Sequence, residues 1–202
     1  MISQRNTTLL CLCLAAVCAV SARAEENEFM LTIDRIFHDK EFELDKKVPS
    51  KWLEGGASYT TVDASESVAD GFDIVRHDSA SGEKSILVSA KQLIPEGAEK
   101  PLEIKDYSWS KDGRFVLIST NTVKFRRLES LGDYWLLNLA DSSLRQVGTD
   151  ASPSSLMYAK FSPDSKFVAY MYLHNIYIES IDGRTKKQLT HDGSDLIVNG
   201  TG

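Results

Sequence analysis

The chain has 202 residues, of which 29 are acidic and 23 are basic, so its formal net charge is −6 at pH 7. An acidic chain lacks the basic face with which proteins bind phosphate backbones, and we therefore expect no nucleic acid partner. The length suits one domain of ordinary size, about 100 to 200 residues.

The first 24 residues have the pattern of an export signal. Arg5 supplies a basic start, residues 9–20 form an apolar run, and Ala22-Arg23-Ala24 places small residues at a cleavage site. The apolar run is too short for a bilayer, which needs about 20 residues, so we expect no membrane span. The mature chain is predicted to begin at Glu25 and to be secreted or periplasmic.

All three cysteines lie inside this signal. Cys11, Cys13 and Cys18 are removed with it, which leaves a mature chain that can form neither a disulfide nor a thiolate metal site. The fold is expected to depend on packing alone.

An internal repeat organises the remaining sequence. The segment 107–118, which contains Trp109, returns as 159–170, with Phe161 in the equivalent position. Two further elements come next in each copy, and an earlier copy of both is also present. The first of these elements occurs at 73–78, 133–139 and 175–181, and the second at 84–88, 144–147 and 187–190.

Each copy has the pattern of consecutive short strands. Apolar and β-branched runs alternate with Asp-Gly, Ser-Gly or Ser-Pro-Asp turns, such as those at 110–113 and 162–165. A repeat of about 40 to 50 residues with four strands is typical of a β-propeller blade. We therefore predict an all-β propeller fold with about three blades.

The aromatic residues of the repeats are predicted to pack between blades rather than to bind a ligand, because each blade buries its faces against its neighbours. These residues are Trp109, Phe115, Tyr134, Trp135, Phe161, Phe167, Tyr170 and Tyr177.

The segment before the repeats differs in pattern. Thr32 is placed to cap a short helix with Ile33, Ile36 and Phe37 on one face. We expect residues 25–50 to be a lead-in segment and residues 51–202 to be a partial propeller, with its first strand pair within 50–63.

A closed propeller needs about four to eight blades, and three blades cannot close a ring. We therefore expect the chain to be a fragment of a longer protein. An isolated arc would expose blade faces and strand edges that promote association.

The sequence contains few patterns that are typical of a catalytic or metal-binding site. It contains no Gly-x-Ser-x-Gly nucleophile motif, and the nearest approach, residues 56–60, lacks the second glycine. We expect no metal and no cofactor, since the histidines do not have the spacing of metal ligands. Each histidine is predicted to lie in a turn or at the surface: His38, His77, His174 and His191.

One basic cluster interrupts the regular spacing of the predicted strands. Lys124-Phe125-Arg126-Arg127 lies between a predicted strand ending near Thr120 and another beginning at Asp133. A loop arginine can anchor a substrate carbonyl or carboxylate through its planar fork of donors. The alternative is a solvated basic loop tip without a binding role.

Four segments resemble the N-terminal region of the dipeptidyl peptidase IV family, and of its bacterial members especially. They are residues 31–37, 51–59, 120–135 and 189–194. The resemblance implies an eight-bladed propeller joined to a C-terminal α/β-hydrolase domain with a Ser, Asp and His triad. It also implies removal of N-terminal dipeptides with proline or alanine in second position, and a homodimer of the full-length protein.

The resemblance assigns one site residue in this chain. Arg127 matches the propeller arginine with which the family holds a substrate carbonyl, whereas Arg126 stands where an aromatic residue is common. The family's paired glutamates, which bind the free amine of the peptide, come after an Asn-Gly-Thr motif that is present here at 199–201. Neither the glutamates nor the triad lies within the 202 residues.

The leading hypothesis is therefore the non-catalytic propeller portion of a serine-type dipeptidyl peptidase, which walls and gates the cavity for a peptide substrate. Two alternatives remain open from the residues. One is a periplasmic TolB-type propeller that binds partner proteins, and the other is a prolyl oligopeptidase-family enzyme with different cleavage rules.

Overall fold

A computed structural model describes residues 30–42, 49–125 and 130–200. The chain divides into two compact units, residues 1–47 and 48–202. The predicted export signal lies outside the described residues. Within the ranges that the structure describes, no helix is both long and apolar enough to cross a bilayer.

The N-terminal unit contains the predicted helix as a single π-type turn, η1 (Asp34–His38). The backbone amide of Arg35 donates to the Thr32 hydroxyl over 3.2 Å, which is the capping contact that the sequence indicates. Ile33 and Phe37 are 77% and 75% exposed. The apolar residues of this turn are therefore not buried within their own unit.

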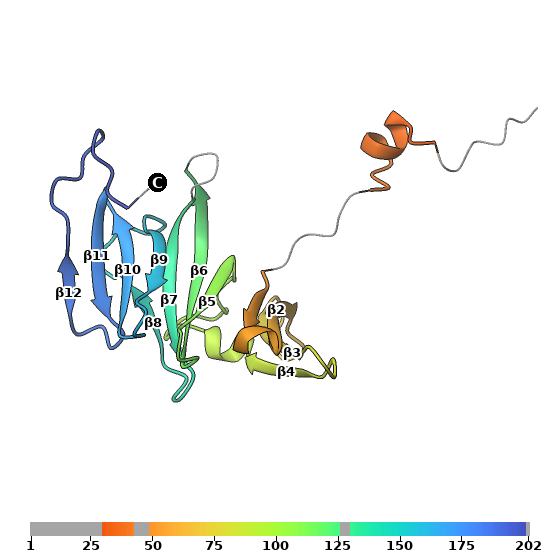
Figure 1. Cartoon of the computed structure of the whole chain (residues 1–202), viewed down its shortest axis with the longest axis horizontal. Coiled ribbons are helices and arrows are strands. Elements are labelled where there is room, and N and C mark those ends of the chain that lie inside the picture. Colours follow the sequence, from red (N-terminus) through yellow and green to blue (C-terminus); the bar gives the residue numbers. More distant parts are fainter. Residues whose placement is uncertain (1–29, 43–48, 126–129, 201–202) are drawn as a thin grey trace, which may run out of the picture. The chain divides into compact units, whose positions relative to one another are not determined.

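The second unit consists of three four-stranded antiparallel sheets, which confirms the prediction of an all-β fold with three propeller blades. In each sheet the strands pair in chain order as a meander (Figure 1). Blade 1 comprises β1 (Lys51–Leu53), β2 (Ser58–Ala64), β3 (Phe72–Asp78) and β4 (Lys84–Val88). Blade 2 comprises β5 (Asp106–Trp109), β6 (Phe115–Lys124), β7 (Ser130–Asn138) and β8 (Leu144–Val147). Blade 3 comprises β9 (Met157–Phe161), β10 (Phe167–Tyr172), β11 (Asn175–Ser180) and β12 (Lys186–Gln188). Two short 3-10 helices, η2 (Glu54–Gly56) and η3 (Ala90–Leu93), come after β1 and β4.

The repeat found in the sequence corresponds to the blades. Trp109 and Phe161 each end the first strand of a blade. In the turn after Trp109, the Ser110 hydroxyl donates to Asp112 over 2.7 Å and accepts from the backbone amide of Phe115 over 2.9 Å. The equivalent contact from Ser162 to Asp164 measures 2.6 Å in blade 3. The turn chemistry is thus the same in both copies.

Apolar residues from neighbouring blades combine into two cores. Tyr107, Val116 and Ile118 of blade 2 pack with Val62 and Ile74 of blade 1. A second cluster joins the other face of blade 2 to blade 3. Of the eight aromatic residues predicted to pack between blades, six belong to these clusters: Trp109, Phe115, Tyr134, Phe161, Tyr170 and Tyr177. Trp135 and Phe167 are half-buried outside both clusters.

The prediction that every histidine lies in a turn or at the surface is wrong for His77. This residue lies in β3 and is only 8% exposed. The strand register places it opposite Tyr59, and the two rings stack with their centroids 4.7 Å apart. Cross-strand pairing, which a list of histidine spacings does not contain, therefore accounts for its burial.

An ion pair ties blade 2 to blade 3. Arg145 Nη1 lies 2.5 Å from Glu179 Oε1, and Arg145 Nε donates to the carbonyl of Ile181 over 2.8 Å. The other oxygen of Glu179 accepts from the backbone amide of Gly148 over 3.0 Å. Glu179 is 6% exposed, so both of its oxygens depend on partners from blade 2.

We predict that Arg145→Ala lowers the free energy of unfolding by about 2 to 3 kcal/mol, because it leaves a buried carboxylate without its cation. The matched control is Lys166→Ala, which removes an exposed ammonium 3.9 Å from Asp164 and should cost less than about 0.5 kcal/mol. Urea denaturation monitored by far-UV circular dichroism measures both. Equal losses in the two variants would contradict a specific role for the buried pair.

The Ser110 hydroxyl, helped by Arg114, lowers the pKa of Asp112 from 3.8 to about 2. Because the folded-state pKa lies below the unfolded one, the charged turn stabilises the fold above the unfolded pKa, and this contribution is lost as the pH falls toward 2. We expect carboxyl-carbon NMR to find Asp112 titrating near 2, and Ser110→Ala to raise that pKa. An Asp112 that titrates near 4 in the parent chain would show that this turn is not formed.

Candidate functional site: the base of the β6–β7 hairpin

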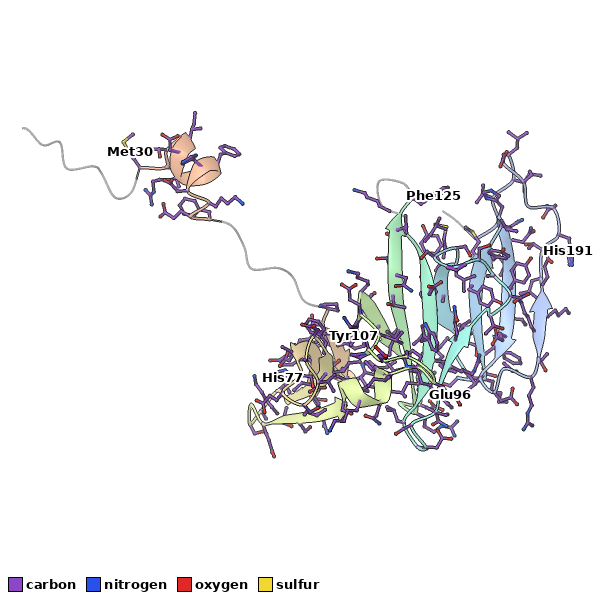
Figure 2. All side chains as sticks on the ribbon, turned by 180° about the vertical axis from the view of Figure 1, so that it is seen from behind. Met30, His77, Glu96, Tyr107, Phe125 and His191 are labelled. Carbon is purple, nitrogen blue, oxygen red and sulfur yellow. The ribbon has the colours of Figure 1, made fainter. Side chains whose placement is uncertain are left out.

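The only site residue that the sequence assigned, Arg127, lies outside the described residues, as does Arg126. The strands that lead to them are described up to Phe125 and again from Ser130 (Figure 2). The described part of the site is therefore its base, where β6 and β7 leave the blade.

The β6–β7 hairpin is longer than the sequence indicated. The prediction of a loop from Thr120 to Asp133 is corrected by the strand register, in which Val123 pairs with Leu131 and Lys124 with Ser130. Ten residues of β6 and nine of β7 form the two arms. In blade 3, by contrast, β10 and β11 are joined directly by Leu173 and His174.

A β-bulge interrupts the pairing at the point where the hairpin leaves the blade. Thr120 pairs with Asp133 and Val123 with Leu131, so Asn121 and Thr122 together face the single residue Gly132. Asn121 has a φ of 48°, in the left-handed region that asparagine tolerates better than most residues. Bulges of this kind bend a strand and redirect the residues beyond it. The polar pair Asn121-Thr122 broke the strand pattern in the sequence, which explains the incorrect loop prediction.

Asp133 connects the two arms of the hairpin to the chain between blades 2 and 3. Its Oδ2 accepts from Asn121 Nδ2 over 2.9 Å, and its Oδ1 accepts from the backbone amide of Ser154 over 2.7 Å. The Ser154 hydroxyl donates to the carbonyl of Asn121 over 2.7 Å. Asp133 is 6% exposed, whereas Ser154 is half-buried and Asn121 is exposed, so the three residues form a closed network at the surface with a buried carboxylate.

Backbone pairing reinforces this network. Gly132 and Leu156 exchange two hydrogen bonds of 2.9 and 3.0 Å, which attach the β8–β9 connection to the edge of β7. A β-carbon at Gly132 would lie 3.0 Å from the carbonyl oxygen of Thr120 and 3.2 Å from Thr122 Cγ2. The bulge therefore fits only around a glycine without displacement of the neighbouring strand.

Equivalent residues in the other blades make the same kind of contact. Asp73 Oδ1 accepts from the backbone amide of Ala90 over 2.6 Å, and Asn175 Oδ1 accepts from that of Gly193 over 3.0 Å. Asp73, Asp133 and Asn175 are 4%, 6% and 8% exposed, and each lies early in the third strand of its blade. We call this contact the blade latch: a buried Asp or Asn side-chain oxygen that holds a backbone amide of the segment after its own blade.

These three positions are equivalent in the sequence repeat, but their role in holding a backbone amide could not be predicted from it. They are the first residues of the segments 73–78, 133–139 and 175–181, and a small acidic or amide side chain at all three was the available signal. Asp and Asn at strand ends usually form turns. For this reason the sequence did not indicate that these side chains accept from a backbone amide far along the chain.

A shallow cavity of about 280 Å³ lies near the first strands of the blades. Its lining includes Lys51, whose ammonium lies 2.8 Å from Asp106 Oδ1, and Tyr134, whose pKa is raised by burial. The cavity is slightly smaller than the range of about 300 to 1,000 Å³ that is usual for ligand sites. Lys51 and Asp106 form an ion pair, and Lys160 is the third charged residue of the lining.

A threonine–histidine contact in blade 1 is not a nucleophile–base pair. Thr61 Oγ1 lies 2.8 Å from His77 Nε2, but the threonine hydroxyl donates its single hydrogen to Asp63 over 2.7 Å. Nε2 of His77 must then be the donor, which is the reverse of what activation of a hydroxyl requires. The contact is therefore structural.

Three consecutive meanders that share inter-blade cores, joined by latched connections, define the class of this protein as a β-propeller. The class is compatible with many functions, so the comparisons with known proteins decide the family. Residues 110–202 match the family model of the dipeptidyl peptidase IV (DPP IV) N-terminal region.

Relatives extend this likeness over most of the chain. Dipeptidyl aminopeptidase B of Saccharomyces cerevisiae is 30% identical over 165 residues, which are 81% of this chain and 18% of that protein. Dipeptidyl peptidase 4 of Trichophyton rubrum is 28% identical over 117 residues, 58% of this chain and 15% of that protein. The crystal structure of Porphyromonas gingivalis dipeptidyl peptidase 4 shares the fold, with a TM-score of 0.66 at 22% identity over 81% of this chain and 22% of its own.

The family match and the relatives support an N-terminal propeller region of a dipeptidyl peptidase IV-like peptidase, and the solved structure supports the fold. The chain spans less than a quarter of the length of each of these three proteins.

We predict that Gly132→Ala destabilises the hairpin base, because the added β-carbon must displace the Thr120 carbonyl. The expected loss is about 1 to 2 kcal/mol in the free energy of unfolding, as for other overpacked sites. Amide hydrogen exchange should be faster at Asn121 and Leu156 than in the parent chain. Unchanged stability together with unchanged exchange would mean that the bulge accommodates a side chain.

Proposed function

We propose that this chain is the non-catalytic propeller portion of a serine-type dipeptidyl peptidase, secreted or periplasmic, that removes dipeptides with proline or alanine second. In this role the blades wall and gate a cavity for the peptide substrate. The observation that carries the proposal is the DPP IV N-terminal family match over 110–202, the region that contains the long β6–β7 hairpin. An export signal at 1–24, a lead-in segment at 25–50 and a partial propeller at 51–202 belong to the same proposal, as does a homodimer of the full-length protein.

Arg127 is the proposed substrate-binding residue. It lies in the connection between β6 and β7, six positions after Asn121 and six before Asp133. A loop arginine can donate to a substrate carbonyl through its planar guanidinium, and such charge-assisted bonds are the stronger kind. The catalytic chemistry would belong to a hydrolase domain outside these residues.

The TolB-type propeller is the competing function. Its blades use the same Ser-Pro-Asp turn as residues 162–164, so the fold alone does not separate the two functions. The names of the relatives found by sequence are those of dipeptidyl peptidases and aminopeptidases, which favours a peptidase.

The proposal is tested by the kinetics of the full-length protein on a glycyl-prolyl chromogenic amide. We expect Arg127→Ala to lower kcat/KM by roughly 30-fold, the effect of losing one hydrogen bond to a charged group worth about 2 kcal/mol. The control is Lys124→Ala, which removes an exposed cation at the end of β6 and should change kcat/KM less than twofold. A full-length protein without dipeptidyl peptidase activity would refute the function, and an unaffected Arg127→Ala enzyme would refute the role of the arginine.

A further inference from the structure

The cavity of about 280 Å³ at the first strands of the blades is lined by residues of all three blades. Lys51 comes from β1 of blade 1, Asp106 from β5 of blade 2, and Tyr158 and Lys160 from β9 of blade 3. We propose that this cavity is a binding site for the carboxylate group of a small ligand. The inference does not use the proposed peptidase function, so either can fail without the other.

A β-bulge in β9 shapes one wall of the cavity. The pairing of β9 with β10 is irregular, because Tyr158 and Ala159 together lie opposite the single residue Tyr170. Bulges of this kind redirect a side chain and occur often beside functional sites. Here the bulge presents Tyr158 at the cavity with 39% of the residue exposed.

The backbone of the bulge is strained. Tyr158 has a φ of 54°, in the left-handed region that a bulky side chain rarely adopts. Such a conformation costs free energy, persists only where its surroundings enforce it, and is found most often at functional sites. Packing alone gives little reason to retain it for a residue as exposed as Tyr158. A contact between its ring and a ligand would give one.

The charges of the lining indicate an anionic ligand. Lys51 Nζ lies 2.8 Å from Asp106 Oδ1, which pairs two of the three charged residues. Lys160 is exposed, and within the part of the chain that the structure describes it forms no ion pair. One unmatched positive charge suits a group with one negative charge. A carboxylate meets this condition better than a phosphate, which carries nearly two charges at neutral pH.

Hydroxyl groups of blade 2 add hydrogen-bond donors. Ser119 and Tyr134 are cross-strand partners in β6 and β7, and both line the cavity. Burial raises the pKa of Tyr134, and hydrogen bonds with the backbone of Ala159 and the side chain of Ser119 act against this rise. The phenol therefore stays protonated at neutral pH. Two hydroxyl groups that share one hydrogen bond have a second proton, which a carboxylate can accept.

The size of the cavity limits the ligand. Its volume is just below the usual range of ligand pockets, about 300 to 1,000 Å³, so it suits a small organic acid or the end of a short peptide. Both present the same carboxylate to the lining, and the experiment distinguishes them.

The experiment is an NMR titration of the ¹⁵N-labelled 202-residue chain with N-acetyl-alanyl-alanine and with its C-terminal carboxamide. We expect a Kd on the order of 1 mM for the acid, as for a small ligand in a shallow site. The carboxamide should bind at least tenfold more weakly, and the shifted amides should include residues 106–108 and 158–160. Equal binding of acid and carboxamide, or shifts confined to other segments, would overturn the proposal.

Lys160→Gln removes the unmatched charge. It should weaken binding of the acid about tenfold, the effect of losing one charge-assisted hydrogen bond, and leave the carboxamide unaffected. The matched control is Lys187→Gln, which removes an exposed cation of β12 that does not line the cavity, and it should change the Kd less than twofold. Equal losses in the two variants would show attraction to net charge rather than a site.

Tyr158→Gly tests the role of the bulge. Glycine adopts a φ of 54° without strain, so this variant removes the ring while the backbone keeps its conformation. We expect a melting temperature close to that of the parent chain and binding of the acid weakened about fivefold, because the aromatic contact is lost. Parental affinity in a folded Tyr158→Gly chain would refute the ligand contact of the tyrosine.

Acetate identifies the source of the carboxylate. Binding of acetate at least tenfold weaker than that of N-acetyl-alanyl-alanine supports a peptide end as the ligand, and equal binding supports a small organic acid. In both cases Lys160→Gln should weaken the binding. Acetate and the dipeptide both binding Lys160→Gln as tightly as the parent chain would overturn the site.

Discussion

Burial between blades is the constraint on which the rest of this structure depends. Neither cluster of buried residues belongs to a single sheet: the first draws Val62 and Ile74 from blade 1 and Ile118 from blade 2, and the second joins blades 2 and 3. Each meander is stable only against a neighbour, because a four-stranded sheet has two faces to cover. The segments between blades must therefore be held at fixed lengths and directions, and the latches of Asp73, Asp133 and Asn175 do this.

In blade 2 the common repeat carries a longer hairpin between its second and third strands. The β6–β7 hairpin is longer than the β10–β11 hairpin, and the bulge at Asn121 redirects it without breaking the sheet. The latch residue then takes a second partner on the hairpin itself. Asn175 of blade 3 likewise contacts its own hairpin, since its Nδ2 donates to the carbonyl of Leu173 over 3.1 Å.

The sequence predicted the repeated features and missed the particular ones. Trp109 and Phe161 revealed the period because the same packing position recurs in both blades, and the turns could be predicted from their Ser and Asp residues. The extension of β6 was missed because a bulge shifts the alternation by one residue and makes Asn121-Thr122 resemble a loop. His77 was misplaced because its burial comes from Tyr59 on another strand. The partners of Asp133 could not be predicted, since one is a backbone amide 21 residues away.

The latch has a consequence for how such proteins diverge. Its donor is in each blade a backbone N–H, contributed by Ala90, Ser154 or Gly193, three small residues. The strand side of the contact supplies an Asp or Asn oxygen, and the connection side must keep its N–H, which excludes proline. At Gly193 the space is limited as well, because a β-carbon there would lie 2.5 Å from Asn175 Nδ2 and from the carbonyl oxygen of His174. Methods that infer contacts from paired substitutions would therefore not detect it. What such a pair retains through divergence is the backbone N–H together with room for only a small side chain beside it, as at Ala90, which is fully buried, and at Gly193.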